Sequence, residues 1–490
     1  MGILITIILL IIIQIGGAII MFVGRDAELQ TLNRLYSKDT FQMVVLYGRR
    51  RIGKTTLITK FIEDKPALFF TAQEANDRIN LQMFSKKVYR FFNIPTGAGH
   101  FEGWYDAFEF LAQKAKEQRF VLAFDEFPYA AEENKSLKSI LQNVIDHALK
   151  DTNLFLILCG SHMSFMENEV LGYKSPLFGR RTAQIKLSGF DYFNASKMLA
   201  SFSYEDKIKF YSCIGGTPHY IAQVDDSLSF EDNIKQLYFD ISGYLYNEPM
   251  MLLQQELREP AMYNSIISAI AGGASKINEI ATRLSEDRSK VNKYITTLMN
   301  LHILVKDYPF GEDLESSRKG IYKILDNCYA FWYRFVFQNL TEIESNTGGI
   351  VADAEVFGES LSNYIGALAF EEICQQYLMR KNLKGELPFT ATSFGKWWGN
   401  DPVQKQQSDF DAIAANRKEK KILCCECKWK NTLADYTEIQ KLMNKNHLLS
   451  EYQERYYYFF SKVDFSKQAK ALEKENKNLK LITLDMLFDN

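Results

Sequence analysis

The chain of 490 residues has almost no excess of charge of either sign, because its formal net charge is −2. No global basic field therefore steers the protein toward nucleic acid, and any such binding must come from a local patch. The chain also lacks the composition of a disulfide scaffold. Its seven cysteines are an odd number and mostly sit in apolar runs, which favours reduced thiols in a cytosolic compartment over disulfide bonds.

Internal repeats and low-complexity segments are absent, so neither a repeat architecture nor a disordered tract is indicated. What the chain does contain is ample material for globular cores, with 47% hydrophobic and 24% charged residues. At this length about two to four domains are expected.

The most informative stretch is Phe41–Phe61. Its apolar run Met43–Leu46 predicts a buried strand, and its second half has the apolar spacing of a helix. Between the two lies a loop with the G-x-x-x-x-G-K-[ST] spacing of a phosphate-binding loop. The loop consists of Gly48, Arg49, Arg50, Arg51, Ile52, Gly53, Lys54 and Thr55, with Thr56 directly after it.

The chemistry of phosphate binding explains this spacing. Gly48 and Gly53 allow the backbone to wrap so that its N–H groups point at phosphate oxygens, and the following helix adds its positive dipole end. Lys54 is expected to reach the β- and γ-phosphates, and the Thr55 hydroxyl to ligate Mg²⁺. An ordinary glycine turn would not explain the strand and the helix on either side. The sequence therefore predicts a site for ATP and Mg²⁺.

A second apolar run, Arg119–Phe127, ends in two adjacent carboxylates. We expect Asp125 to hold the Mg²⁺ shell and Glu126 to orient or polarise the attacking water. The alternative is a strand end with solvated acids, which the phosphate-binding loop about seventy positions upstream makes less attractive.

Two further residues are candidates for the same reaction. Ser161 follows a third predicted strand, Leu154–Cys159, at the place of a γ-phosphate sensor, although a loop serine is common. Arg180 precedes the last predicted strand, Ala183–Leu187, and can stabilise transition-state charge in cis or in trans. Arg181 is the second choice for this role, and a surface arginine pair is the alternative.

Six motifs now stand together: FVGR at 22–25, GRRRIGKT at 48–55, FDEF at 124–127, CGS at 159–161, PLFGR at 176–180 and GGTPHY at 215–220. As a set they resemble the archaeal-type ATPases, a branch of the AAA+-like P-loop ATPases that also occurs in bacteria. The resemblance covers nearly the whole chain. It implies a parallel five-strand core with a helical lid, and catalytic and binding roles for Lys54, Thr55, Asp125 and Glu126.

The uncharged N-terminal run Gly2–Ile20 is long enough to span a bilayer. A signal peptide is disfavoured because the basic n-region and the cleavage site are missing. A membrane anchor would place the protein on the inner face of the cell membrane, because basic residues follow the run. We favour a third interpretation, a mis-called start with translation from Met21, because the ATPase motifs begin at Phe22 without a linker. The expected location is then the cytoplasm.

The middle of the chain predicts three helices and a two-stranded wing, which together make a winged helix. The helical patterns cover 261–271, 276–284 and 288–301, and the strand-like runs cover 301–305 and 322–325. The third helix could enter a DNA major groove, or the whole unit could be an intramolecular lid or a protein contact. The exposed residues expected on this helix are Arg288, Lys290, Asn292, Lys293 and Thr296. The aromatic segment 326–339 is expected to be interdomain core.

The C-terminal half carries a second candidate site. Ser408–Ala415 and Ile422–Trp429 predict two paired strands. Asp411 lies on the first, and Glu426 and Lys428 share a face of the second. An Asp followed by Glu-x-Lys is the arrangement of restriction-endonuclease-like folds, in which two carboxylates hold Mg²⁺ and the lysine helps to activate a water.

Two other carboxylates accompany this set. Glu371 on the preceding helix could complete the metal shell, and Asp409 is expected on the same side as Asp411 and could replace it. KWWG at 396–399, FDAIA at 410–414 and ECKWKN at 426–431 resemble the C-terminal domain of the same ATPase family, whose fold resembles a nuclease. A retained fold without cleavage is the alternative.

The three cysteines near Glu426 do not predict a zinc site, because adjacent strand positions cannot converge on one tetrahedral ion. We expect Cys424, Cys425 and Cys427 to be core thiols, with one of them exposed.

The sequence thus predicts an α/β protein whose P-loop sheet carries a helical lid, followed by a winged helix and an endonuclease-like α/β domain. The expected divisions are 1–20 apolar leader, 21–187 ATPase core, 188–258 lid, 259–325 winged helix, 326–353 aromatic bridge and 354–490 C-terminal domain. The expected function is ATP hydrolysis coupled to a DNA-binding or nuclease-like domain, and a homo-oligomer is left open. The competing hypothesis is a nucleotide-dependent switch that recruits protein partners, with an inert nuclease-like domain.

Overall fold

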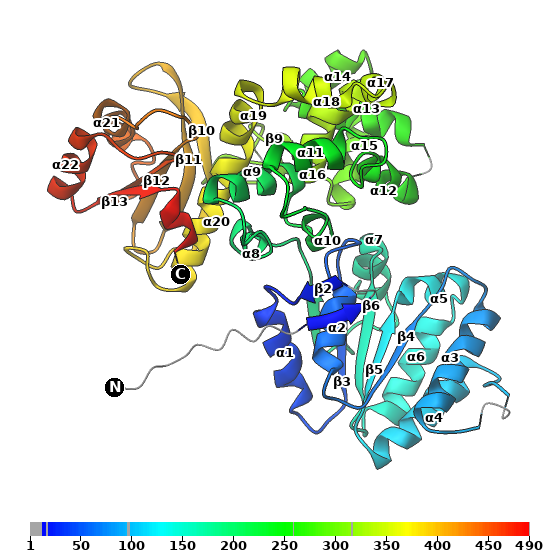
Figure 1. Cartoon of the computed structure of the whole chain (residues 1–490). Coiled ribbons are helices and arrows are strands. Elements are labelled where there is room, and N and C mark those ends of the chain that lie inside the picture. Colours follow the sequence, from blue (N-terminus) through cyan, green and yellow to red (C-terminus); the bar gives the residue numbers. More distant parts are fainter. Residues whose placement is uncertain (1–11, 16–17, 96–98, 258, 315–316, 490) are drawn as a thin grey trace. The chain divides into compact units, whose positions relative to one another are not determined.

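The computed structural model describes residues 12–15, 18–95, 99–257, 259–314 and 317–489 (Figure 1). The chain divides into two compact units, Met1–Gly189 and Phe190–Asn490, and each is described by itself.

The expected apolar leader falls largely on residues outside those ranges. Its described parts, β1 (Ile12–Ile15) and β2 (Ala18–Met21), pair as antiparallel strands. Among the described residues no helix is both long enough and apolar enough to cross a membrane. The choice between a membrane anchor and a mis-called start stays a prediction.

The first unit is built on a parallel five-stranded sheet, as the family resemblance implied, and the strand order is β4-β5-β6-β3-β7. Three of the strands are buried on both faces, which is why they read as continuous apolar runs in the sequence. The strands are β3 (Gln42–Tyr47), β4 (Ala67–Thr71), β5 (Val121–Asp125), β6 (Phe155–Gly160) and β7 (Ala183–Lys186).

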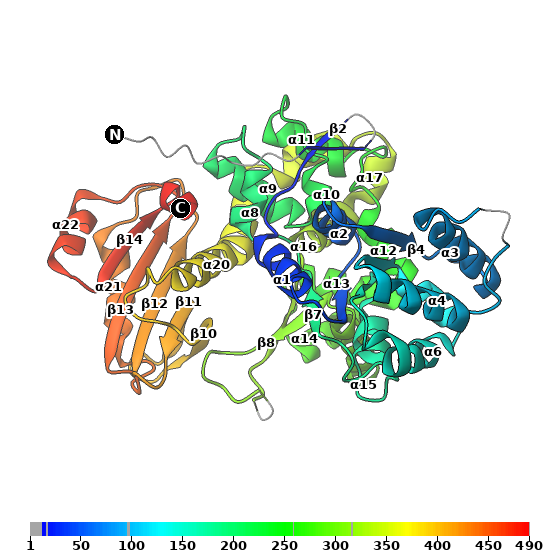
Figure 2. The same cartoon turned by 90° about the horizontal axis from the view of Figure 1, so that it is seen from below.

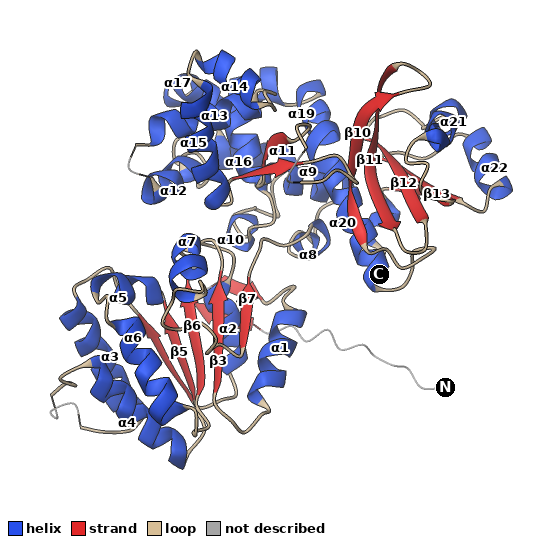
Figure 3. Cartoon of the chain, turned by 180° about the vertical axis from the view of Figure 1, so that it is seen from behind, coloured by secondary structure: helices blue, strands red, loops and turns tan. Residues whose placement is uncertain are grey.

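Helices cover both faces of this sheet (Figure 3). On one face, α1 (Asp26–Tyr36) and α2 (Lys54–Ile62) pack their apolar side chains against Val44, Leu46 and Ile157. The other face is covered by α3 (Asp77–Phe91), α4 (Trp104–Glu117), α5 (Phe127–Glu133) and α6 (Leu137–Val144), followed by η2 (Ile145–Leu149), α7 (Met163–Phe165) and η3 (Met166–Val170). Because the strands are parallel, the loops that follow β3, β5 and β6 lie at one edge of the sheet.

The second unit begins with helices and continues with a helical set and an antiparallel strand pair in the predicted order. The first helices are α8 (Tyr192–Lys197), α9 (Tyr204–Ile214), α10 (Pro218–Ile221), α11 (Phe230–Tyr238) and α12 (Glu248–Glu256). The set that follows is α13 (Pro260–Ala271), α14 (Ile277–Leu284), α15 (Arg288–Asn300), β8 (Leu304–Asp307) and β9 (Ile321–Ile324).

Short helical segments lead from there to the last sheet. They are α16 (Asn327–Phe331), η4 (Trp332–Val336), η5 (Phe337–Asn339), α17 (Leu340–Glu344), α18 (Gly348–Val351), η6 (Ala352–Val356), α19 (Glu359–Tyr364), η7 (Ile365–Ala369) and α20 (Phe370–Leu383). The side chains of Tyr329, Phe331, Trp332 and Tyr333 are buried in the core of the unit, so this aromatic segment is not a surface for stacking.

The C-terminal sheet has the order β10-β11-β12-β13-β14, with antiparallel pairing between its first three strands and parallel pairing between its last three. Figure 2 shows α20 on one face and α21 and α22 on the other. The elements are β10 (Ser393–Asp401), β11 (Gln406–Asn416), β12 (Lys421–Lys428), α21 (Tyr436–Asn444), η8 (Lys445–His447), β13 (Glu454–Ser461), α22 (Lys467–Glu475), β14 (Leu479–Thr483) and η9 (Asp485–Phe488).

Burial on both faces of β12 corrects the expectation about its cysteines. Cys424, Cys425 and Cys427 are all buried free thiols, so the expectation that one of them is exposed is wrong. The reason is that Cys425 and Cys427 lie in the core on the α20 side while Cys424 lies in the core on the α21 side.

Candidate functional site

The loop between β3 and α2 depends on glycine at both of its ends. Gly53 precedes the helix with φ 87°, in the left-handed region that L side chains rarely adopt. Gly48 has a different reason to be glycine, because a Cβ there would overlap the main-chain oxygen of Leu187. Leu187 is held beside the loop because its N–H donates to the Tyr47 carbonyl oxygen over 2.8 Å.

These two glycines give a testable contrast. Gly53→Ala is expected to lower the free energy of unfolding by about 1–2 kcal/mol through backbone strain, and Gly53→Asn by less because asparagine tolerates this region. Gly48→Ala is expected to cost roughly 1–3 kcal/mol by overpacking, and Gly48→Asn more. Urea unfolding of the four variants measures their free energies of unfolding. A Gly48→Asn variant more stable than Gly48→Ala would contradict the prediction.

Lys54 is the first residue of α2, and its side chain turns back into the phosphate-binding loop. Its Nζ donates to the carbonyl oxygens of Gly48, at 2.9 Å, and Arg49, at 3.0 Å. The side chain is buried, and burial lowers its pKa below the usual lysine value. A buried ammonium surrounded by main chain is thus positioned at the start of α2.

Thr55 and Asp125 come together across the sheet edge, although 70 positions separate them. The Thr55 hydroxyl donates to Asp125 Oδ2 over 3.2 Å, and Asp125 is only 4% exposed. Hydroxyl and carboxylate oxygens are ligands that Mg²⁺ prefers. The pair therefore fits the metal ligands predicted from the sequence.

Glu126 has an unusual backbone conformation, and Ser161 holds its carboxylate. Its backbone lies in the left-handed region, with φ 49° and ψ 41°, which costs a non-glycine residue about 1–3 kcal/mol and clusters at functional sites. Its Oε2 accepts from the Ser161 hydroxyl at 2.9 Å and from the Ser161 N–H at 3.2 Å. Ser161 meets Glu126 because β5 and β6 are neighbours in the sheet.

The structure places Arg180 in a different environment from the loop residues. Its guanidinium forms two hydrogen bonds with the carboxylate of Asp146, at 2.9 and 2.6 Å, and a third with the Pro176 carbonyl oxygen at 2.9 Å. The ion pair raises the pKa of Arg180 and lowers that of Asp146. Among the arginines of the phosphate-binding loop, Arg50 donates to the Tyr129 hydroxyl at 2.8 Å.

Sequence reasoning gave Arg25 no role in the candidate site, but the structure brings it to the loop. It is buried, and its guanidinium donates to the carbonyl oxygens of Ile52, at 3.1 Å, and Ser188, at 2.6 Å. It thus joins the loop to the segment after β7. Its membership of the FVGR motif was the available signal, but the spacing gave no partner.

In the C-terminal domain, a bulge sets the position of Asp411. Gly395 pairs with Ile413 and Trp397 with Phe410, so Lys396 alone lies opposite Asp411 and Ala412. The Asp411 carboxylate is buried and accepts from the Cys427 N–H at 2.7 Å. Bulges redirect side chains, and they are frequent next to functional sites.

The same bulge interrupts the alternation from which Asp409 and Asp411 were expected to be interchangeable. The side chain of Asp409 is 63% exposed and lies 3.6 Å from Lys445 Nζ, whereas Asp411 is buried against β12. The two carboxylates therefore occupy different environments.

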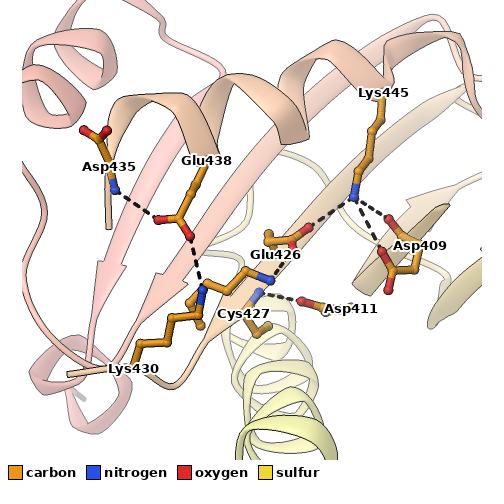
Figure 4. Close-up of polar contacts among 9 residues, drawn as sticks. Asp409, Asp411, Glu426, Cys427, Lys430, Asp435, Glu438 and Lys445 are labelled. Atoms are coloured by element: carbon orange, nitrogen blue, oxygen red, sulfur yellow. Dashed lines mark hydrogen bonds and ion pairs between the residues drawn. The ribbon is translucent and has the colours of Figure 1, made fainter. Parts of the chain in front are cut away.

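Glu426 and Glu371 are both paired with lysines (Figure 4 shows the contact of Glu426 with Lys445). One oxygen of Glu426 contacts Lys428 and the other contacts Lys445 at 3.3 Å. Glu371 on α20 pairs with Lys396 at 2.6 Å. Across the described ranges, no group of three or more His, Cys, Asp or Glu side chains is arranged to hold a metal ion. In this cluster Asp411, Glu426 and Glu371 contact lysines and main chain, and their role as metal ligands stays a prediction.

Asp411 gives a prediction on pH dependence. Burial, followed by the charges of Glu426 and Glu371, raises its pKa to about 7. Between about pH 4 and 7 the folded protein therefore keeps a proton that the unfolded chain releases, so the free energy of unfolding falls as pH rises, by up to about 4 kcal/mol. Asp411→Asn, which keeps the acceptor for Cys427, should lose this slope in urea unfolding at several pH values. Equal slopes in both proteins would contradict it.

The parallel sheet, the glycine loop closed over a buried lysine and the Thr55–Asp125 pair define the P-loop class of nucleoside triphosphatases. A family described as an ATPase domain predominantly from Archaea matches residues 22–224, and a family of archaeal and bacterial proteins of unknown function matches residues 332–442. An uncharacterized protein of Methanocaldococcus jannaschii is 32% identical over 452 residues, which cover 91% of this chain and 97% of that protein. The chain belongs to this family of archaeal-type ATPases.

Other comparisons cover smaller parts or are more distant. An uncharacterized ATP-binding protein of Methanocaldococcus jannaschii is 51% identical over 47 residues, 10% of this chain and 80% of that protein. The solved ORC2 protein of Aeropyrum pernix has a TM-score of 0.43 at 14% identity and covers 66% of this chain and 94% of its own. Cdc6p of Pyrobaculum aerophilum has a TM-score of 0.34 at 15% identity, with coverages of 66% and 95%.

Proposed function

We propose that the first unit binds ATP with Mg²⁺ and hydrolyses it. The observation that carries the proposal is the meeting of Lys54, Thr55, Asp125 and Glu126 at one edge of the sheet, supported by their hydrogen bonds. Lys54 would bind the β- and γ-phosphates, with main-chain N–H groups of residues 48–56 around them. Thr55 and Asp125 would hold Mg²⁺, which neutralises charge on the phosphates.

Glu126 would accept a hydrogen bond from the attacking water and orient it, with Ser161 fixing its carboxylate. Arg180 remains the candidate for stabilising transition-state charge, in cis or in trans. Because Asp146 binds its guanidinium through two hydrogen bonds, this role requires that ion pair to open.

The direct test is binding of a fluorescent ATP analogue to the full chain. We expect micromolar or tighter affinity with Mg²⁺ and a marked loss in EDTA, because Thr55 and Asp125 contribute only through the metal. No nucleotide binding under either condition would end this proposal.

For the second unit we propose contact with DNA, by a winged helix formed from α13, α14, α15, β8 and β9 and by the C-terminal domain. Arg288, Lys290, Asn292, Lys293 and Thr296 are exposed on α15. Lys290 is paired with Glu286 at 2.9 Å, which weakens the positive face. A switch that recruits protein partners therefore remains the second candidate.

Cleavage of DNA by the C-terminal domain is the finer part of this proposal. In the structure, the two carboxylates that such a reaction would use, Asp411 and Glu426, lie on adjacent strands with Lys428 beside them. Incubation of plasmid DNA with the wild type and Glu426→Gln in Mn²⁺ tests it. We expect nicking by the wild type and at least about 100-fold less by the variant. Equal nicking by the two proteins, or no nicking by either, would contradict cleavage at this site. The C-terminal domain would then be interpreted as an inert nuclease-like fold.

A further inference from the structure

Lys445 belongs to the same polar cluster as Glu426, although it follows α21 and lies outside both strands (Figure 4). Its Nζ donates to the Asp409 carbonyl oxygen at 2.9 Å and contacts Glu426 Oε2 at 3.3 Å. The side chains of Lys445 and Glu426 are 16% and 14% exposed. The contact is therefore largely shielded from water and differs from an exposed surface ion pair.

The chain around Lys445 holds it in this position. Asp435 and Glu438 form a capping box at the start of α21, and Ile439 and Leu442 of that helix are buried in the core. At the other end of η8, His447 Nε2 lies 2.8 Å from Asp401 Oδ1 on β10. Contacts on both sides of Lys445 therefore fix its segment, and its side chain lies beside the start of β11 and the end of β12.

The charges of the cluster are nearly balanced. Glu371, Asp409, Asp411 and Glu426 carry four negative charges when ionised, and Lys396, Lys428 and Lys445 carry three positive ones. One net negative charge remains when Asp411 is ionised, and none when Asp411 keeps the proton that its raised pKa favours.

We propose that Lys445, together with Lys428, forms a phosphate-contacting pair of the C-terminal domain, held in register by the two oxygens of Glu426. The proposal rests on the DNA contact proposed above and names the residue that supplies it in this domain. An ammonium group that carries three donors can contact phosphate while it keeps one bond to Glu426 and one to the Asp409 main chain. Lys445 lies on η8, so it does not belong to the pattern of Asp411, Glu426 and Lys428 on the two strands.

A matched control is available in Lys430. It follows β12, its side chain is 60% exposed, and it contacts Glu438 of α21 at 3.5 Å instead of Glu426. Lys430→Met removes the same charge as Lys445→Met but leaves the pair on Glu426 intact.

The experiment measures binding of a short DNA duplex to the full chain in EDTA over a range of salt concentrations. Lys445→Met is expected to weaken binding about tenfold at 0.1 M salt and to lower the slope of log K against log salt by about one. Lys445→Arg should bind like the wild type, because it restores the charge. Lys430→Met should leave both the affinity and the slope unchanged.

Lys445→Met with the affinity and slope of the wild type would overturn the proposal, and so would an equal loss in Lys430→Met. A wild type that binds no duplex at all would instead remove the proposed DNA contact itself, and this inference with it. Should Lys445→Met fail to fold, acetylation of the wild type with and without DNA decides. Lys445 must be protected by DNA several-fold more than Lys430, and equal protection would refute its role.

Discussion

Replacing Lys54 by alanine is expected to abolish ATP turnover, with a fall in kcat/KM of roughly 100-fold to 1,000-fold or more. The ammonium is already buried and bound to the carbonyl oxygens of Gly48 and Arg49, so it is organised before a nucleotide arrives. Burial lowers its pKa, and the negative charges of Glu126 and Asp125 oppose that fall, so the group has charge partners in its site. A steady-state phosphate-release assay with the full chain measures the loss.

Lys60→Ala is the matched control for this experiment. Lys60 lies on the same helix but pairs with Glu63 at the opposite end from the loop. Replacing Lys60 should change ATP turnover less than about twofold. The reason is that an ion pair with an exposed carboxylate such as Glu63 contributes little to stability. Turnover that survives in Lys54→Ala would show that the loop is not the site of hydrolysis.

Glu126→Gln is expected to separate nucleotide binding from hydrolysis. A carboxamide keeps the size of the side chain and can still accept from Ser161, but it is a poor acceptor for a proton or a polarised water. We expect kcat to fall by roughly 100-fold to 1,000-fold while the affinity for ATP with Mg²⁺ changes little. Single-turnover hydrolysis and equilibrium binding on the same preparation give the two values.

Ser161→Ala and Glu133→Gln are the comparison variants for Glu126→Gln. Ser161→Ala removes the hydroxyl but leaves the main-chain N–H on Glu126, so a smaller loss, about tenfold in kcat, is expected. Glu133 is exposed at the end of α5, and its replacement should have no effect. A Glu126→Gln variant that loses ATP affinity as strongly as turnover would make Glu126 a binding residue instead.

The candidate ATPase site could be predicted in unusual detail because its residues are local to strand ends. The loop 48–55 has the spacing of its class, and Asp125 and Glu126 come at the end of an apolar run that predicts a buried strand. Parallel strands then bring both segments to one edge. The same reasoning gave Ser161 a place at the edge, but not its bond to Glu126, since that depends on β5 and β6 being neighbours.

The C-terminal cluster was predictable only as a strand pattern. Asp411, Glu426 and Lys428 follow from alternation along two strands, but the bulge opposite Lys396 changes how Asp411 lies relative to Asp409. The partners that neutralise the carboxylates, Lys396 and Lys445, come from other elements, and no periodicity marks them.

By itself the sequence determined the P-loop and the apolar strands, with two carboxylates at the end of one of them, because glycine geometry and strand burial act over a few neighbouring residues. The parallel sheet was implied by the family resemblance. Only the tertiary structure decided which polar groups contact one another. Arg180 pairs with Asp146, Arg25 donates to the loop main chain, and Lys445 pairs with Glu426. Long polar side chains reach across elements, and their partners depend on packing between segments far apart in the chain. That is the physical reason why the loop could be predicted from the sequence while these polar pairs could not.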